Sequence, residues 1–146
     1  MKILSKSLEN TEKMAREFVE KEFVKNDGGA LIVGLYGDLG SGKTAFTQVV
    51  AKCLGVKETV TSPTFVIEKI YKLDHRDFEH LIHIDAYRLK NGDELLHLGW
   101  EEIAKNPKNI IFIEWPERVA EILPNNMKKI YFTFVNEDTR EIEIRL

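Results

Sequence analysis

Apolar residues recur along the chain at two spacings, one typical of helices and the other of buried strands. The helical spacing holds over residues 14–23 and again over residues 45–54, where Gly55 closes the segment. An unbroken apolar run of strand length covers residues 30–36, and mostly apolar runs of strand length cover residues 80–85 and 109–114. Such runs predict strands that are buried on both faces of a sheet.

The remaining segments complete an alternation of strands and helices. Further strands are expected over residues 2–4 and 65–73, with a helix over residues 93–105 and another helix start at Pro116. The end of the chain, residues 129–135 and 140–146, alternates around Asn136 and Glu137 like a β-hairpin. This order predicts an α/β fold, a three-layer domain with a mixed, mainly parallel sheet and a C-terminal β-hairpin. Because 146 residues suffice for only one core, residues 1–146 are expected to form a single domain.

Composition and charge narrow the classes of function. The formal net charge is -3 and no basic stripe stands out. The chain therefore lacks the basic surface expected of a protein that binds nucleic acid without a partner. No segment approaches the roughly 20 apolar residues that cross a bilayer, and the first residues do not resemble a secretory signal. We therefore expect a cytoplasmic protein without a membrane role. The single cysteine, Cys53, falls within a helical apolar pattern and is expected to pack in the core.

One segment carries a strong chemical signature, the pattern G-x-x-x-x-G-K-[ST]. Its residues are Gly37-Asp38-Leu39-Gly40-Ser41-Gly42-Lys43-Thr44. Glycines let the backbone curl around an anion so that successive N–H groups point inward, and the N-terminus of the following helix reinforces this nest. Lys43 is then expected to bridge the β- and γ-phosphates, and the Thr44 hydroxyl to bind magnesium. The pattern, flanked by a predicted strand and helix, predicts a P-loop NTPase domain that binds ATP and Mg²⁺.

Two acidic residues end apolar strands that should lie beside this loop. Asp85 follows the run at 80–84, and Glu114 follows the run at 110–113. Because the carboxyl ends of parallel strands meet at one edge of a sheet, both carboxylates are expected near the phosphates. We assign Glu114 to magnesium, directly or through water, and Asp85 to water activation or the second metal shell, a division that the sequence leaves open. His83 shares a strand face with Asp85 and either supports the carboxylate or is a satisfied core histidine.

A third candidate segment lies between the P-loop helix and the next predicted strand. It is Ser62-Pro63-Thr64-Phe65. Switch segments of P-loop hydrolases reach toward the γ-phosphate from this position, which makes Thr64 a candidate contact to magnesium or the terminal phosphate. An ordinary Ser-Pro turn that leads into a strand is the alternative.

Together these segments resemble the TsaE family of bacterial ATPases, formerly the YjeE family. The resemblance spans nearly the whole chain and rests on Thr11, the P-loop, Ser62-Pro63-Thr64-Phe65, His83-Ile84-Asp85-Ala86-Tyr87-Arg88-Leu89 and Ile113-Glu114-Trp115-Pro116-Glu117-Arg118. The P-loop alone is shared by many families. The combination with S-P-T-F, H-x-D-x-Y-R and E-W-P-E-R, in this order and length, is far more specific.

The resemblance implies a role in making threonylcarbamoyladenosine beside the anticodon of tRNA. In this family the ATPase does not transfer the threonylcarbamoyl group; it assembles with the TsaB and TsaD proteins, and its ATP hydrolysis resets that transferase between turnovers. Contact with tRNA is then only indirect. Carried over by position, Lys43, Asp85 and Glu114 serve hydrolysis, and Thr44 and Glu114 attend the magnesium. Thr11 and Trp115 lie near the nucleotide, with core packing as the alternative for Trp115. The expected activity is a Mg-dependent ATPase that is weak alone and stimulated by its partners.

Two other classes of protein remain as alternatives. A small-molecule P-loop kinase shares the fold, and Asp85-x-x-Arg88 resembles a phosphate-acceptor motif, although no arginine-rich lid segment is evident. A GTP-dependent switch would need an N-K-x-D guanine motif, which the chain lacks, and it would need glycine where Arg88 stands. Phosphoryl transfer to a metabolite would support the kinase, and preference for GTP over ATP would support the switch.

Overall fold

The computed structural model describes residues 2–24, 28–38, 41–60 and 67–145. In chain order the elements are β1 (Lys2–Ser5), α1 (Leu8–Glu22), β2 (Leu31–Tyr36), α2 (Lys43–Cys53), β3 (Glu68–Lys72), β4 (His80–Asp85), α3 (Gly92–Leu96), α4 (Trp100–Lys105), β5 (Asn109–Glu114), the 3-10 helix η1 (Pro116–Ile122), β6 (Lys128–Asn136) and β7 (Thr139–Arg145). Within the described residues, no helix combines the length and the apolar character that crossing a membrane requires.

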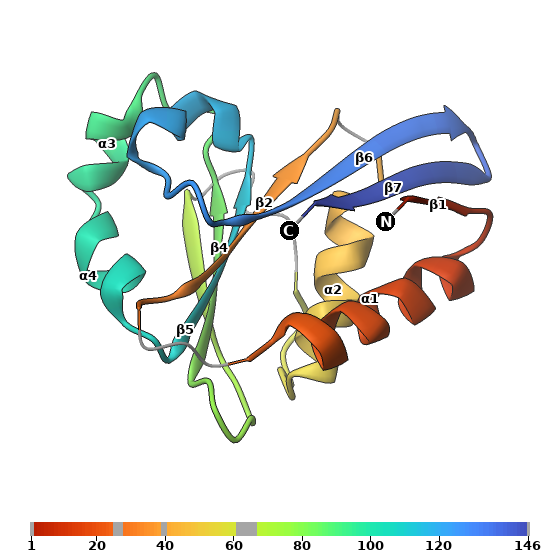
Figure 1. Cartoon of the computed structure of the whole chain (residues 1–146), viewed down its shortest axis with the longest axis horizontal. Helices are drawn as coiled ribbons and strands as arrows, with labels where there is room; N and C mark the ends of the chain where they lie inside the picture. The colour runs from red at the N-terminus through yellow and green to blue at the C-terminus, as the bar shows by residue number, and fades with distance from the viewer. Residues whose placement is uncertain (1, 25–27, 39–40, 61–66, 146) are drawn as a thin grey trace.

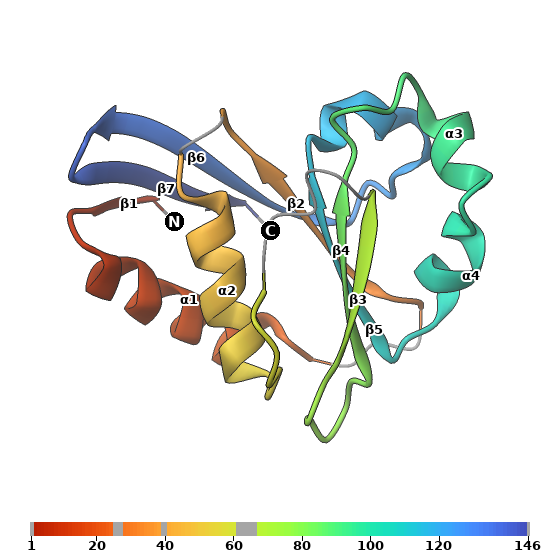
Figure 2. The same cartoon turned by 180° about the vertical axis from the view of Figure 1, so that it is seen from behind.

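The described strands form one seven-stranded sheet in the order β1-β7-β6-β2-β5-β4-β3. Strands β6, β2, β5 and β4 run parallel in the centre, and antiparallel pairs complete both ends. Helices α1 and α2 cover one face, whereas α3, α4 and η1 cover the other (Figure 1, and from behind in Figure 2). The predicted three-layer α/β fold, with a mixed sheet and a C-terminal hairpin of β6 and β7, is confirmed.

Successive residues of the central strands point to opposite faces of the sheet, which produces two cores. Leu81 and Phe112 pack on the side of α1 and α2, while Ile82 and Ile111 pack on the side of α3 and α4. All six residues of β5 are buried. Burial on both faces explains why apolar residues predominate in these strands, because neither face is open to water. The strands predicted over residues 80–85 and 109–114 are confirmed at both of their ends.

The helix predicted over residues 93–105 is instead two short helices. Helix α3 ends at Leu96 and α4 begins at Trp100. Between them Gly99 has a φ of 88°, in the left-handed region where an L side chain is strained. Leu95 and Trp100 are both buried, so the apolar spacing continues across the break and predicted one helix where the backbone turns.

Cys53 is exposed, so the prediction that it packs in the core is wrong. The buried positions of α2 include Phe46, Val50 and Ala51, at spacings of three to four residues. Cys53 lies at the margin of that stripe in the last turn of the helix. Of the strand predicted over residues 65–73, β3 covers Glu68–Lys72, and residues 65 and 66 lie outside the described part.

The parallel pairing brings three strand ends to one edge of the sheet. Glu114 lies beside Asp85 on one side and beside Leu35 of β2 on the other. The glycine-rich segment leaves β2 at this same edge and enters α2. The fold therefore gathers the predicted loop and both predicted carboxylates in one place.

Candidate functional site

Glycines shape the connection between β2 and α2. Gly37 has a φ of 144°, and a Cβ atom there would lie 2.5 Å from the carbonyl oxygen of Phe132 in β6. Gly42 has a φ of 103° and is the N-cap of α2. Both positions combine a backbone conformation that favours glycine with the course of a loop that turns sharply into a helix.

Lys43 is the central side chain of the site. Only 4% of the residue is exposed, and its Nζ donates a hydrogen bond to the carbonyl oxygen of Gly37 at 2.5 Å. The same Nζ lies 3.9 Å from Oε1 of Glu114 and 4.6 Å from the centre of the Trp115 ring. An ammonium group has three donors, and among the described residues only the Gly37 carbonyl is within hydrogen-bond distance. The buried charge thus keeps donors for an anion.

The start of α2 offers further donors to an anion. No side chain in the described residues caps Gly42, and the first turn, which includes Lys43 and the half-buried Thr44, has no acidic residue. Ser41 is 1% exposed, and its Oγ has no hydrogen-bond partner among the described residues. Asp38 is exposed, and its carbonyl accepts the N–H of Ser41 at 3.2 Å. An orphaned hydroxyl beside an uncapped helix start is suited to phosphate oxygens. Leu39, Gly40 and Thr64 lie outside the described residues.

The two carboxylates have different surroundings although they are neighbours. Glu114 is 5% exposed, and its Oε2 accepts a hydrogen bond from Nε2 of His83 at 2.7 Å. Asp85 is half-buried, and its Oδ1 accepts the backbone N–H of Tyr87 at 3.0 Å. Burial raises the pKa of the Asp85 carboxyl above its ordinary value; the bond from Tyr87 opposes that rise, and the charge of Glu114 adds to it. A carboxylate with a raised pKa is better suited to accept a proton.

Trp115 continues the site from Glu114 toward the surface. Its φ and ψ of 57° and 49° place it in the left-handed region, which is uncommon for a residue other than glycine. This backbone turn lays its ring beside Lys43. The ring of Tyr87 is 5.1 Å from that of Trp115, and the guanidinium of Arg118 lies 5.3 Å from the Tyr87 ring. Two neighbouring aromatic rings thus lie between the buried Lys43 and the exposed Arg118.

Thr11 lies near the start of α2 although it is distant in sequence. It helps to line a hollow of about 280 Å³ together with Gly42, Ala45 and Arg140. The Oγ1 of Thr11 is 2.7 Å from the Oγ of Ser5. Sequence reasoning missed Arg140, because it belongs to an ordinary hairpin strand and reaches this hollow only through the pairing of β7 with β1. No local sequence pattern predicts that contact.

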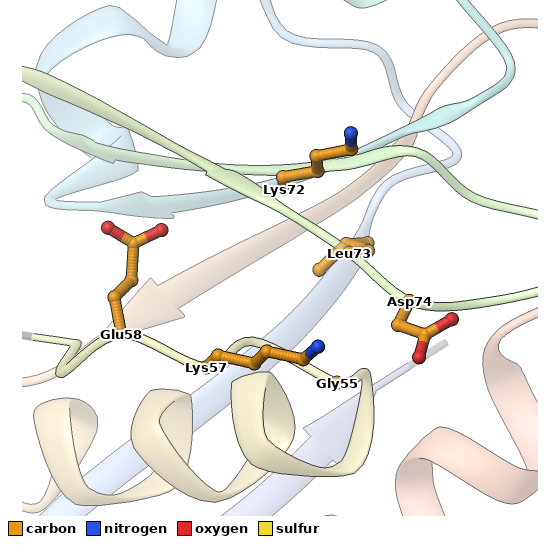
Figure 3. Close-up of a pocket in the computed structure, with 6 residues that line it drawn as sticks. All are labelled: Gly55, Lys57, Glu58, Lys72, Leu73 and Asp74. Atoms are coloured by element: carbon orange, nitrogen blue, oxygen red, sulfur yellow. The ribbon is translucent and has the colours of Figure 1, made fainter.

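A second hollow, of about 450 Å³, lies at the other end of α2. Its lining is Gly55, Lys57, Glu58, Lys72, Leu73 and Asp74 (Figure 3). Side chains of both charge signs line it, and none of the predicted site residues is among them. The residues with the expected chemistry therefore gather at the Gly42 end of the helix.

The course of the chain through this site defines a class of protein. A buried strand turns through glycines into a helix whose first residue is a buried lysine, and two carboxylates end the neighbouring strands. This combination is that of P-loop nucleotide-binding proteins.

The chain belongs to the TsaE family within that class. The family model described as "Threonylcarbamoyl adenosine biosynthesis protein TsaE" matches residues 5–142. The tRNA threonylcarbamoyladenosine biosynthesis protein TsaE of Rickettsia bellii is 34% identical over 137 residues, which cover 93% of this chain and 91% of that protein. The Bacillus subtilis protein of the same name is 37% identical over 111 residues, covering 76% of this chain and 66% of that protein.

A solved structure agrees with this membership. The crystal structure of Bacillus subtilis YdiB superposes with a TM-score of 0.75 at 29% sequence identity, covering 97% of this chain and 82% of that one. The resemblance read from the sequence is thereby confirmed, and the family membership favours it over a small-molecule kinase. The family role lies in the biosynthesis of threonylcarbamoyladenosine in tRNA, and it implies nucleotide binding with an ATPase type of activity.

Proposed function

We propose that this chain binds and hydrolyses ATP as one component of the cytoplasmic machinery that makes threonylcarbamoyladenosine in tRNA. The observation that carries the proposal is the placement of Lys43, which lies buried between the Gly37 carbonyl, Glu114 and Trp115 at the edge where β2, β4 and β5 end. A buried ammonium at a glycine-lined helix start is suited to a triphosphate. Family membership supplies the tRNA role.

Different residues of the chain bind the phosphates, activate the water and bind the nucleoside of ATP. The loop amides, the Ser41 hydroxyl and Lys43 hold the phosphates. Asp85, whose carboxyl has a raised pKa, orients the attacking water and accepts its proton. The nucleoside lies toward the hollow lined by Thr11, Gly42 and Arg140. Trp115, whose ring is 4.6 Å from Nζ of Lys43, also lies near the nucleotide.

The donor set at this edge also fits magnesium. Thr44 offers a hydroxyl, and Glu114 offers the carboxylate oxygen that His83 does not occupy. Magnesium prefers such hard oxygen ligands and usually keeps several waters. When bound, it neutralises charge on the phosphate oxygens. The residues proposed to attend it are therefore Thr44 and Glu114.

The complex proposed to use this ATPase contains the TsaB and TsaD proteins. The chain does not transfer the threonylcarbamoyl group. Its hydrolysis of ATP resets the transferase between turnovers, and its contact with tRNA is indirect, through the complex. The net charge of -3 is consistent with indirect contact, since a protein that holds RNA alone presents a basic surface.

Binding of ATP depends on Lys43 in this proposal. Hydrogen bonds to charged groups contribute about 1.5–3 kcal/mol, so Lys43→Ala is expected to weaken ATP binding about 10- to 100-fold. Isothermal titration calorimetry with ATP and Mg²⁺ measures this. Lys52→Ala, an exposed lysine later in the same helix, is the matched control and should bind like the unaltered chain. Titration with GTP in parallel tests the guanine alternative, and absence of binding by well-folded unaltered protein contradicts the proposal.

A further inference from the structure

A buried histidine supports Glu114 from the side of the core. His83 lies within β4, is 0% exposed, and places Nε2 at 2.7 Å from Oε2 of Glu114. The register of β4 and β5 sets Phe112 beside His83 and Glu114 beside Asp85. The contact is thus a diagonal one, and it approaches the carboxylate from the buried interior.

The two oxygens of the Glu114 carboxylate have different neighbours. Oε2 meets His83, and Oε1 faces Nζ of Lys43 at 3.9 Å. A direct hydrogen bond between an ammonium and a carboxylate is about 2.7–2.9 Å long. Glu114 is therefore held close to Lys43 without binding it directly.

The hydrogen-bond inventory decides which nitrogen of His83 carries the proton in this contact. An ionised carboxylate only accepts, so Nε2 is the donor. Nδ1 is buried and has no hydrogen-bond partner among the described residues. A second N–H at Nδ1 would leave a donor without an acceptor in the core. The ring is thus a single donor aimed at Glu114.

From these contacts we infer that His83 is a positioning residue, which holds Oε2 of Glu114 so that Oε1 stays directed toward the nucleotide's magnesium and Lys43 stays available for phosphate. Without this donor, the carboxylate is free to rotate and to form a direct ion pair with Lys43, which would occupy both groups. The inference rests on the proposed function and deepens it. It assigns His83 a role through Glu114 and no contact of its own with ATP.

Two amide substitutions that differ in reach test this role. The amide nitrogen of His83→Gln takes about the place of Nε2 and retains a donor, whereas that of His83→Asn takes the place of Nδ1 and does not reach Glu114. Partners that orient a metal ligand typically change metal affinity by about 10- to 100-fold. We expect His83→Asn to lower the affinity for ATP with Mg²⁺ about tenfold, with less change in affinity when a chelator removes the metal. His83→Gln should recover most of the loss.

Calorimetry with ATP, in magnesium and in chelator, gives these affinities without relying on hydrolysis. His80→Asn, in the same strand but on its other face, is the matched control, and the unfolding transition of each variant shows whether it folds. If His83→Asn does not fold, His83→Leu replaces it as an apolar variant without the donor. Equal magnesium dependence in His83→Asn and the unaltered chain, or equal losses in the Asn and Gln variants, overturns the inference while leaving ATP binding intact. Failure of the unaltered chain to bind ATP instead overturns the proposed function.

Discussion

Asp85 and Glu114 are adjacent at the ends of parallel strands, yet their surroundings separate their chemistry. Glu114 is buried against a histidine donor, and Asp85 is half-buried beside one backbone N–H. The sequence predicted both carboxylates from their position after apolar runs. It left their division of roles open, because the side chain that distinguishes them, His83, contacts Glu114 from the neighbouring strand and lies 31 residues away in the sequence.

The raised pKa of Asp85 has a consequence for stability. Because the folded protein binds this proton more tightly than the unfolded chain does, stability falls as pH rises through the raised pKa. Asp85→Asn removes the charge, so it should raise the free energy of unfolding at neutral pH. The gain should vanish below the ordinary carboxyl pKa of 3.8, where both states carry the proton.

Urea unfolding at several pH values measures this difference, and ATP turnover measured alongside should fall. Asp74→Asn is the matched control, because the side chain of Asp74 is exposed. A loss of stability in Asp85→Asn at neutral pH, or a gain that does not change with pH, would contradict the assignment of burial as the dominant cause.

The elements themselves were predicted best where burial imposes a pattern. Strands β4 and β5 match their predicted ends, since both of their faces meet apolar layers. The pair α3 and α4 was predicted as one helix, because Gly99 redirects the backbone without interrupting the apolar spacing. Cys53 shows a similar limit, since periodicity does not reveal how the last turn of a helix meets the layer below it.

The break at Gly99 leads to a prediction about backbone strain. Apart from its chain neighbours, no described residue lies within 4 Å of a Cβ atom built at Gly99, so Gly99→Ala meets no clash there and costs only the left-handed conformation. That cost is about 1–2 kcal/mol of unfolding free energy. Gly99→Asn should cost less, because asparagine tolerates this region better. Denaturant unfolding of both variants checks the order, and an alanine variant as stable as the unaltered chain would contradict it.

The arrangement of the whole molecule depends on contacts between distant parts of the chain. The pairing of β1 with β7 closes one end of the sheet and brings the hairpin to the hollow beside Thr11. Hydrophobic patterns predicted the layers and the hairpin, but strand order depends on long-range pairing that such patterns do not encode. A single domain over residues 1–146 stays a prediction.

At this scale the proposed partnership is testable. The site is open at Tyr87, which is 51% exposed, and a site without a completed charge-stabilising shell hydrolyses ATP slowly. Turnover should therefore rise about tenfold or more when the TsaB and TsaD proteins are added. A phosphate-release assay measures it. The Lys43→Ala variant mixed with the same partners is the control for ATP hydrolysis by the partners themselves. This mixture should show no turnover above that of the partners alone. Unchanged turnover of the unaltered chain would count against the partnership.

The contact between Lys43 and Trp115 also means that the fluorescence of Trp115 should report nucleotide binding. Indole emission responds to nearby charge, and this ring lies 4.6 Å from the ammonium that is proposed to receive the phosphates. The second indole, at Trp100, is buried in the core on the side of α3 and α4, the same core against which Trp115 packs. Replacing Trp100 with phenylalanine would leave a single emitter beside the loop, so nucleotide arrival could be followed in real time without any attached dye.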